Sequence, residues 1–307
     1  MEYRMNLGLS PKYRFGVELE FTGIYLDVLD KIFKEHDLPV KYVLDHKNRY
    51  ASYNVWYLDY DNTVSVSRGK RYYNGELSSR IMTDRKECWE ELRQICQVLR
   101  DYGVGVNDRC SNHITVGLSY LQDEKYFFEV LSKLLILYEN ELVFFYMGEN
   151  YGIRKTMDSY ARRVGINLLD KIDLFDFSDM NFLYRFIEMY PTVFGKHCAI
   201  NLRKYVREEL MEIRYPNGTI DCGTIQNNVN FSLKLVDAID RRIIDLDELS
   251  WKIDSNREEV MTKLKSGETR EEDFAWLVSK IAENSLDRDR FMKQYRRVVN
   301  SKKNGVV

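Results

Sequence analysis

Residues 13–21 alternate between apolar and polar side chains, which is the pattern of a strand with one buried face. Short runs of strand-forming residues predict further strands over residues 112–118, 197–202 and 209–215. Residues 40–82 show the pattern of short strands and turns, and Asn74-Gly75 predicts a hairpin turn among them. Together these segments predict a sheet in which hairpins are common.

Apolar residues also recur with helical spacing in several segments. This spacing predicts amphipathic helices over residues 25–36, 84–103 and 123–146. Asp84 and Glu87 have the spacing of a capping box at the start of the second helix. From residue 224 onward the pattern is helical, with a break near Gly267, whereas the pattern is weak over residues 148–196.

The order of these elements favours one fold class. Hairpins outnumber regular strand–helix–strand repeats, so we expect an α+β fold with a mainly antiparallel sheet. We expect residues 1–240 to form the domain that carries the sheet and residues 241–307 to form a C-terminal helical extension packed on it. Gly16 and Gly75 are isolated, so neither a P-loop nor a dinucleotide-binding fingerprint is supported.

Composition and charge narrow the functional classes. The 307 residues are 44% hydrophobic and 31% charged, which is typical of a soluble protein with a sizeable core. A net charge of −2 gives no global argument for nucleic acid or an anionic membrane. The 5 cysteines lack C-x-x-C spacing, which favours reduced thiols. With no apolar signal segment expected at the N-terminus and charges interrupting residues 126–146, we expect a cytoplasmic protein without a membrane span.

Two acids of the first strand are the first candidates for chemistry. Glu18 and Glu20 are two residues apart, so both side chains lie on the polar face, about 6–7 Å apart. Two negative charges at that distance repel by about 2–3 kcal/mol at an effective dielectric constant near 20. A bound cation would reverse this penalty, although a solvated strand face would also explain the pair.

Other segments offer single candidates of the same kind. Asp61 lies in a turn, Glu76 follows the expected hairpin, and His113 lies in a strand. Each has a purely structural interpretation on its own. An imidazole beside carboxylates is, however, a suitable ligand for a divalent metal.

Glu212 and Arg214 share one face of the strand over residues 209–215. They can simply pair with each other, or they can serve a metal and a phosphate, because a guanidinium group binds phosphate oxygens in a planar, bidentate way. Hard oxygen ligands with one histidine suit Mg²⁺ or Mn²⁺ better than zinc. The combined pattern indicates a metal and nucleotide-phosphate site.

The run from Phe15 to Phe21 resembles the opening strand of the putative amidoligases, which are relatives of glutamine synthetase and glutamate–cysteine ligase. The resemblance covers about residues 13–240. Later motifs follow in the family's order: Trp56 to the Asp61 turn, Gly75-Glu76-Leu77-Ser78-Ser79, Asn112-His113-Ile114-Thr115-Val116, Arg154 with Tyr160, Asn201, Glu212-Ile213-Arg214, and Gly218-Thr219-Ile220-Asp221.

This resemblance implies a curved, mainly antiparallel sheet of the glutamine-synthetase catalytic-domain type, with helices on its outer face and the active site on its concave face. It also implies divalent metals that bridge ATP. The positions that match metal ligands are Glu18, Glu20, Asp61, Glu76, His113 and Glu212. By the same matching, Glu212 and Arg214 are catalytic, Arg214 contacts phosphate, and Arg154 and Asn201 contact the nucleotide or substrate.

The chain departs from the family pattern in two places. Ser79 is followed by Arg80 where the family usually has proline, and Asn62-Thr63 replaces a glycine and a serine in the Asp61 turn. Asparagine tolerates the left-handed conformation and threonine keeps a hydroxyl group, so the turn can be retained. No predicted metal ligand is lost.

The implied activity is an ATP- and Mg²⁺-dependent ligase that joins a small-molecule or peptide carboxylate to an amine through an acyl phosphate. Three alternatives stay open from the residues alone. The same site could phosphorylate a guanidino or carboxylate group, or the chain could be an inactive nucleotide-binding or interaction protein. The basic segment Arg288–Lys303 could contact nucleic acid or an acidic protein, but a solvated helix face is the favoured interpretation. The sequence leaves the oligomeric state open.

Overall fold

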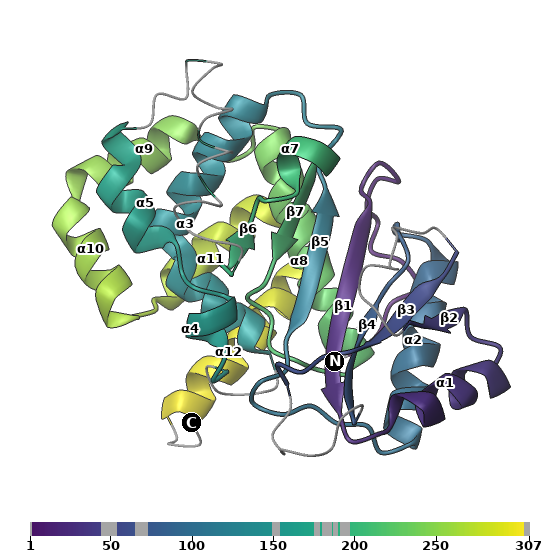
Figure 1. The fold of residues 1–307 in the computed structure, drawn as a ribbon. Coiled ribbons are helices and arrows are strands. Elements are labelled where there is room, and N and C mark those ends of the chain that lie inside the picture. Colours follow the sequence, from purple (N-terminus) through teal and green to yellow (C-terminus); the bar gives the residue numbers. More distant parts are fainter. Residues whose placement is uncertain are drawn as a thin grey trace.

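A computed structural model describes residues 2–43, 54–64, 73–148, 154–174, 179, 186, 190 and 197–303. Its strands are β1 Phe15–Thr22, β2 Val40–Tyr42, β3 Trp56–Tyr60, β4 Asn74–Ser78, β5 Asn112–Gly117, β6 Ile200–Asn201 and β7 Leu210–Ile213. They form a 7-stranded sheet in the order β2-β3-β4-β1-β5-β7-β6 (Figure 1). Only β2 and β3 pair in parallel, and the other pairs are antiparallel. The predicted α+β class with a mainly antiparallel sheet is therefore confirmed.

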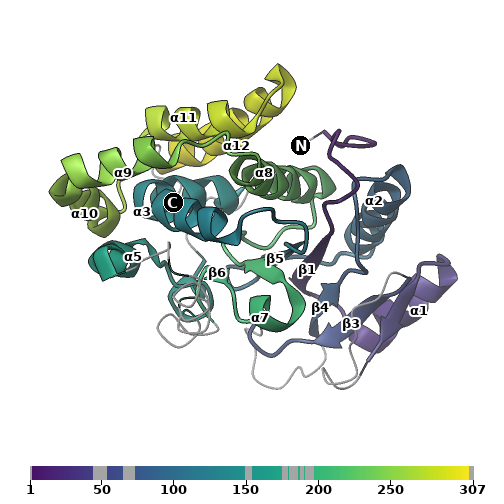
Figure 2. The ribbon, with the colours of Figure 1, turned by 90° about the horizontal axis from the view of Figure 1, so that it is seen from above.

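Helices pack around this sheet. They are α1 Leu26–Glu35, α2 Lys86–Asp101, α3 Glu124–Met147, α4 Met157–Tyr160, α5 Gly165–Lys171, the 3-10 helix η2 Ile172–Leu174, α7 Tyr205–Glu208, α8 Cys222–Asp240, α9 Leu246–Ser255, α10 Arg257–Ser266, α11 Glu271–Ile281 and α12 Ser285–Lys303. Figure 2 shows α2, α3 and α8 along the same side of the sheet, with α9 to α12 forming an outer layer over α3 and α8. The division into residues 1–240 and 241–307 stays a prediction.

The alternation in β1 explains why the helices gather on that side. Phe15, Val17, Leu19 and Phe21 are at most 3% exposed, and the Phe15 ring stacks on Trp89 of α2 with ring centroids 5.2 Å apart. Burying four such side chains against helices favours folding by several kcal/mol. The polar residues between them must then lie on the opposite face.

The predicted hairpin turn at Asn74-Gly75 is wrong, because both residues belong to β4. Gly75 lies opposite Tyr60 of β3 and Phe21 of β1. A Cβ atom at Gly75 would lie 2.6 Å from Leu26 Cδ2 and 2.7 Å from the Asp59 carbonyl oxygen. The glycine is needed for close packing of α1 on the sheet, not for a turn.

The predicted capping box at Asp84 is also wrong. The N-cap residue of α2 is Arg85, which makes no side-chain cap. The Asp84 carboxylate instead accepts hydrogen bonds from the Leu7 and Leu9 backbone amides, both at 2.8 Å, and from Trp89 Nε1 at 2.7 Å. The Asp84 carboxylate therefore binds residues distant in the chain instead of capping α2, and it holds the N-terminal segment against that helix.

Helix α3 differs from the predicted amphipathic helix because both of its sides are covered. Glu139 and Glu141 are 0% exposed. Glu139 accepts hydrogen bonds from the Val164 and Gly165 amides at 2.7 and 2.8 Å, and Glu141 pairs with Lys263 of α10 at 2.8 Å. Two of the charges that interrupt residues 126–146 are thus bound inside the protein by residues that follow them in the chain.

Two other expectations are confirmed. The five cysteines are free and buried, and Cys88 and Cys96 lie on the buried side of α2. The helical break occurs at Gly267, which has a φ of +67° directly after α10. Among the described residues, no helix combines the length and the apolar character needed to cross a membrane.

Asp287 of α12 provides a test of how the C-terminal helices are attached. Its carboxylate is 0% exposed and accepts hydrogen bonds from Arg4 Nη2 at 2.6 Å, Asn230 Nδ2 at 2.8 Å and Asn284 Nδ2 at 2.7 Å, while Lys234 Nζ lies 3.3 Å away. Burial by itself raises the pKa of Asp287. The Asn284 hydrogen bond and the two cations lower the pKa by more than burial raises it, so the net pKa lies below its ordinary value.

We expect Asp287→Asn to lower the free energy of unfolding at pH 7 by about 3–5 kcal/mol, because it removes a fully buried anion and leaves the partly buried cations Arg4 and Lys234 without it. Urea denaturation followed by circular dichroism measures this change. Since the pKa of Asp287 is lowered in the folded state, the parent loses the same stabilisation as the pH falls through that pKa, and the two proteins should converge in acid. The matched control is Asp289→Asn, at an exposed position of the same helix. Equal stability of parent and Asp287→Asn at pH 7 would contradict the assignment.

Candidate metal centre

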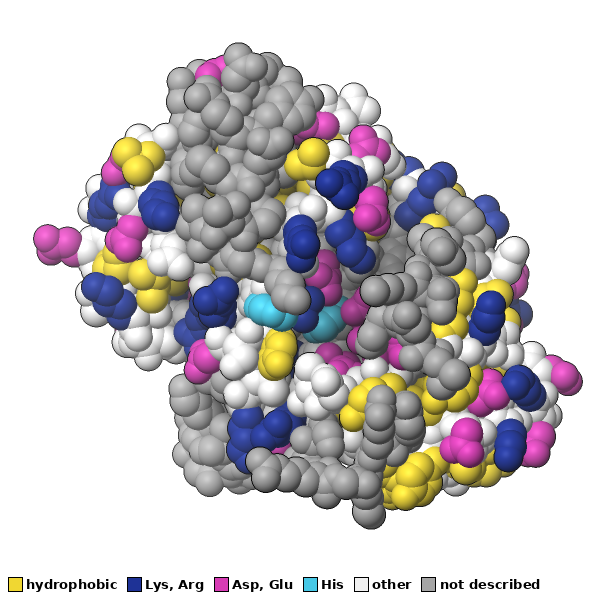
Figure 3. Space-filling model, in the orientation of Figure 1, with side chains coloured by type: hydrophobic (Ala, Val, Ile, Leu, Met, Phe, Trp, Pro, Cys, Tyr) yellow, Lys and Arg dark blue, Asp and Glu magenta, His cyan; other side chains and the backbone are white. Residues whose placement is uncertain are grey.

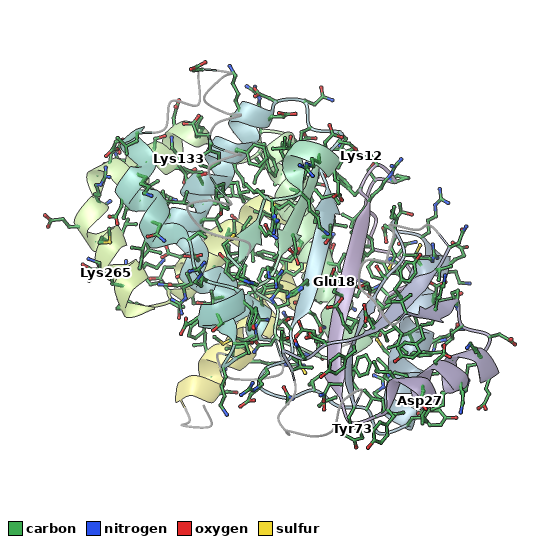
Figure 4. All side chains as sticks on the ribbon, viewed as in Figure 1. Lys12, Glu18, Asp27, Tyr73, Lys133 and Lys265 are labelled. Carbon is green, nitrogen blue, oxygen red and sulfur yellow. The ribbon has the colours of Figure 1, made fainter. Side chains whose placement is uncertain are left out.

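The sheet face opposite the helices collects acidic side chains from neighbouring strands. Glu18, labelled in Figure 4, lies midway along the central strand β1. The register places Glu18 opposite His113 of β5, and Glu20 opposite Glu76 of β4. Glu212 of β7 lies opposite Thr115 of β5. Like charges directly opposite each other destabilise a sheet, so this face carries an electrostatic cost.

The structure brings the six predicted ligand residues into two groups. Glu18, His113 and Glu212 form the first, and Glu20, Asp61 and Glu76 form the second. Within each group, one nitrogen or oxygen atom from each residue lies within 4.8 Å of the others. Their role as metal ligands stays a prediction, but their proximity is a geometric fact.

The first group is centred on the His113 imidazole. Its Nδ1 atom lies 2.9 Å from Glu18 Oε2 and 3.3 Å from Glu212 Oε1, and its Nε2 atom lies 2.9 Å from Ser111 Oγ. Burial, followed by the positive charge of Arg214, lowers the pKa of His113 to about 3. The ring is therefore neutral at pH 7, which is the form that binds metal ions. Ser111 fixes its orientation, as second partners of metal-binding histidines commonly do.

The second group consists of three buried carboxylates. Each accepts a hydrogen bond: Glu20 Oε2 from the Ser111 amide at 2.6 Å, Asp61 Oδ1 from the Thr63 amide at 2.7 Å, and Glu76 Oε1 from Ser78 Oγ at 2.9 Å. Burial, and then the charge of Asp61, raise the pKa of Glu20 to about 8. Two ionised carboxylates whose oxygen atoms lie 4.8 Å apart, the limit within this group, repel by about 3 kcal/mol at an effective dielectric constant near 20.

The donor atoms of both groups fit a hard divalent cation. The second group offers only carboxylate oxygens, and the first offers two carboxylates and one imidazole. Oxygen-rich sets of this kind suit Mg²⁺ or Mn²⁺, whereas zinc sites favour sulfur and nitrogen ligands. The residues present therefore fit the metal that the sequence predicted.

Glu212 is held from both sides. Arg214 Nη1 donates to Glu212 Oε1 at 2.8 Å, and Asn201 Nδ2 donates to Glu212 Oε2 at 2.6 Å. Arg214 Nε also donates to the Tyr160 carbonyl oxygen at 2.8 Å. No described residue accepts from the remaining Arg214 nitrogen, Nη2, which leaves a donor for an incoming anion. Arg214 and Asn201 thus both lie beside Glu212, and their predicted contacts with phosphate, nucleotide or substrate stay predictions.

Arg154 lies beneath the site and is 4% exposed. Its Nη1 and Nη2 atoms donate to the carbonyl oxygens of Pro216 and Arg214, at 2.7 and 2.8 Å. Burial lowers the pKa of Arg154 to about 10, so it stays charged at pH 7 and its charge opposes that of Glu20. This geometry favours positioning of the Arg214 backbone over the predicted contact with nucleotide or substrate.

A cavity of about 280 Å³ is lined by every member of the two groups except Glu212. Its lining residues are Glu18, Glu20, Asp61, Asn62, Thr63, Glu76, Arg109, Ser111, His113, Thr156, Tyr160, His197 and Arg214. Figure 3 shows the histidines in the middle of this face, with acidic side chains beside them and Lys and Arg side chains close by.

Several lining residues were not predicted from the sequence. Ser111 lies two positions before His113, so the strand alternation could have identified it. His197 also lines the cavity, and its ring packs edge-on against Tyr160 with centroids 5.0 Å apart. No local pattern in the sequence brings His197 to the cavity, because its position depends on the tertiary fold.

Comparison with known families agrees with this geometry. The fold and site define an α+β protein with a carboxylate-rich centre on one sheet face. A sequence model described as "Putative amidoligase enzyme" matches residues 11–236, which is more than half of the 307 residues. The chain therefore belongs to this amidoligase family, which indicates an enzyme of the ligase type. A search of curated proteins found no match.

Metal binding to this centre can be tested without any substrate. We expect Mn²⁺ to stabilise the parent, by about 2.7 kcal/mol when its concentration is 100-fold above the dissociation constant. Glu76→Gln should lose the part of this gain that comes from the second group, because it removes one of its three carboxylates. Thermal unfolding with EDTA or Mn²⁺ measures the shift, and electron paramagnetic resonance counts the bound Mn²⁺.

Glu87→Gln, at an exposed position of α2, is the matched control and should respond to Mn²⁺ as the parent does. If Mn²⁺ leaves the parent unchanged, or stabilises Glu76→Gln equally, the centre does not bind metal as we expect.

Proposed function

We propose that this chain is an ATP- and Mg²⁺-dependent ligase that joins a carboxylate to an amine, on a sheet of the glutamine-synthetase catalytic-domain type. One observation carries the proposal: five of the six candidate ligand residues line one cavity together with the Arg214 guanidinium group, and Arg214 is hydrogen-bonded to the sixth, Glu212. Membership of the amidoligase family supports the same reaction class. A nucleotide triphosphate needs positive charge around it, and this cavity can gather that charge from cations and Arg214.

The proposed reaction has two steps. A carboxylate oxygen of the acyl substrate attacks the γ-phosphorus of ATP, the bond to the β-phosphate oxygen breaks, and ADP leaves. The amine nitrogen then attacks the acyl carbon, and inorganic phosphate leaves with the proton that the amine gives up. When bound, Mg²⁺ ions would screen the phosphate charge and polarise the phosphoryl oxygens.

The side chains of this protein contribute position and charge. Arg214 lines the cavity, and its Nη2 donor, which has no partner among the described residues, can stabilise charge on the transferred phosphoryl group. Asn201 holds Glu212 in place, and Ser111 holds His113. Phosphoryl transfer depends mainly on such positioning and electrostatic stabilisation, so the site does not require a nucleophilic side chain.

The decisive experiment is an assay of ADP release with Mg²⁺ and ATP across a panel of carboxylates and amines, with mass spectrometry of the products. A ligase gives ADP, phosphate and a product whose mass equals carboxylate plus amine minus water. A phosphorylated product that accumulates without an amine requirement would instead indicate a phosphotransferase. Absence of ADP release across a broad panel would count against both activities.

Arg214→Lys should lower kcat by about 10²–10³, because an ammonium group cannot bind both Glu212 and a phosphate in the planar geometry of guanidinium. Glu18→Ala and Glu212→Ala should abolish ADP release by removing ligands of the first group. Steady-state kinetics in the assay above measures these effects. Arg100→Lys, at an exposed position of α2, is the control. Turnover of ATP by Glu18→Ala and Glu212→Ala at the parent rate would overturn the proposed site.

A further inference from the structure

A second cavity, of about 610 Å³, adjoins the metal centre. Its lining residues are His197, Asn201, Arg203, Lys204, Arg207, Glu208, Glu212 and Arg214. His197 and Arg214 also line the acidic cavity, so the two spaces meet at these side chains. We call the second space the basic compartment.

Helix α7, which forms much of the basic compartment, is firmly anchored. It connects β6 to β7, and its Tyr205 is buried edge-on against Phe128 of α3 with ring centroids 4.8 Å apart. Glu209 ends the helix with a φ of +52°, and its carbonyl oxygen accepts a hydrogen bond from the Leu118 amide at 2.7 Å. The exposed side chains of α7 therefore project from a fixed base.

The charge of the basic compartment is unbalanced. Arg203, Lys204, Arg207 and Arg214 face only two acids, Glu208 and Glu212. Glu212 is already bonded to Arg214 and Asn201. Within the described part of the chain, no acid forms an ion pair with the three cations at positions 203, 204 and 207. Clustered cations of this kind favour an anionic ligand.

The lining argues against a purine base as that ligand. A nucleoside base is uncharged and is best held by apolar or aromatic surfaces, as in most small-molecule sites. Apart from His197, the basic compartment is lined by charged side chains and one amide. The space therefore suits the anionic part of a substrate better than the adenosine part of ATP.

We propose that the basic compartment binds the acyl substrate, and that this substrate carries at least one anionic group besides the carboxylate that is activated. This inference rests on the proposed ligase function, because it assigns the activated carboxylate to the adjoining acidic cavity. Arg214, which lines both spaces, would lie between the two anionic groups. The substrate class is thus a small molecule or peptide with two or more carboxylate or phosphate groups.

The test uses N-acetyl-glutamyl-glutamate, which has three carboxylates, as the probe in calorimetric titrations at low salt. ATP and metals are left out of this first arm. We expect the probe to bind the parent, and to bind a Lys204→Gln/Arg207→Gln double variant roughly tenfold more weakly, because two exposed charges are lost. The uncharged analogue N-acetyl-glutaminyl-glutamine amide should show no comparable affinity.

The matched control is Lys31→Gln/Lys265→Gln, which removes two exposed cations from α1 and α10. It should bind the probe as the parent does. Equal affinity of the parent for the charged and uncharged probes, or of the parent and the Lys204→Gln/Arg207→Gln variant for the charged probe, would overturn the inference. Circular dichroism and thermal unfolding verify that the exposed substitutions leave the fold intact.

A second arm measures MgATP binding to the same variants. We expect its affinity to be unchanged by Lys204→Gln/Arg207→Gln. A loss of MgATP affinity with unchanged probe affinity would show that the basic compartment belongs to the nucleotide, and the inference would be wrong. Because the first arm contains neither ATP nor metal, a failure of the proposed ligase activity would leave its result intact, so the two failures are distinguishable.

Discussion

Repulsion among carboxylates on one face of the sheet is the constraint that the rest of the site addresses. Glu20 lies opposite Glu76, and the fold adds Asp61 to this second group and brings Glu18 and His113 of the first group to the same cavity. Part of this repulsion is relieved because the raised pKa of Glu20 favours its protonated form, whereas the neutral His113 ring offsets none of the negative charge. Hydrogen bonds to every carboxylate of the second group relieve more of it. What remains is a strong preference for positive charge, which is the property that a nucleotide-phosphate site needs.

Apolar packing on the opposite face of the sheet offsets the cost of placing these acids close together. Burial of the apolar side of β1 against helices contributes several kcal/mol, comparable with the repulsion between a pair of acids. Helix α3 is itself enclosed by the C-terminal helices, and Lys263 reaches its buried Glu141. The candidate site is therefore carried by strands of a well-packed sheet, which hold side chains more precisely than loops do.

Local periodicity explains what could be predicted from the sequence. The alternation in β1 correctly separated Glu18 and Glu20 from the core, and helical spacing identified the buried side of α2. The order of the motifs predicted which six residues meet, although their chemistry remains to be tested. Nothing local revealed the partners of Asp84, the close packing at Gly75 or the burial of Arg154, because those features depend on segments distant in the chain.

The basic compartment is another feature that local sequence patterns do not predict. Arg203, Lys204 and Arg207 look like an ordinary solvated turn in the sequence. They gain significance only because the pairing of β6 with β7 brings Asn201 opposite Glu212 and places this segment beside the candidate metal centre. The cations of this short connection thus lie close to a candidate site because the two strands that it joins carry residues of that site.

The alternation along β1 has a consequence for folding fidelity. A pairing error of one residue would turn Val17 and Leu19 toward the cavity and bury Glu18 and Glu20 among the helices. Such a misaligned sheet would lose its core and its ligands at the same moment, so it would be both unstable and inactive. Correct packing of the apolar side chains of β1 against the helices therefore also places Glu18 and Glu20 on the cavity side of the sheet.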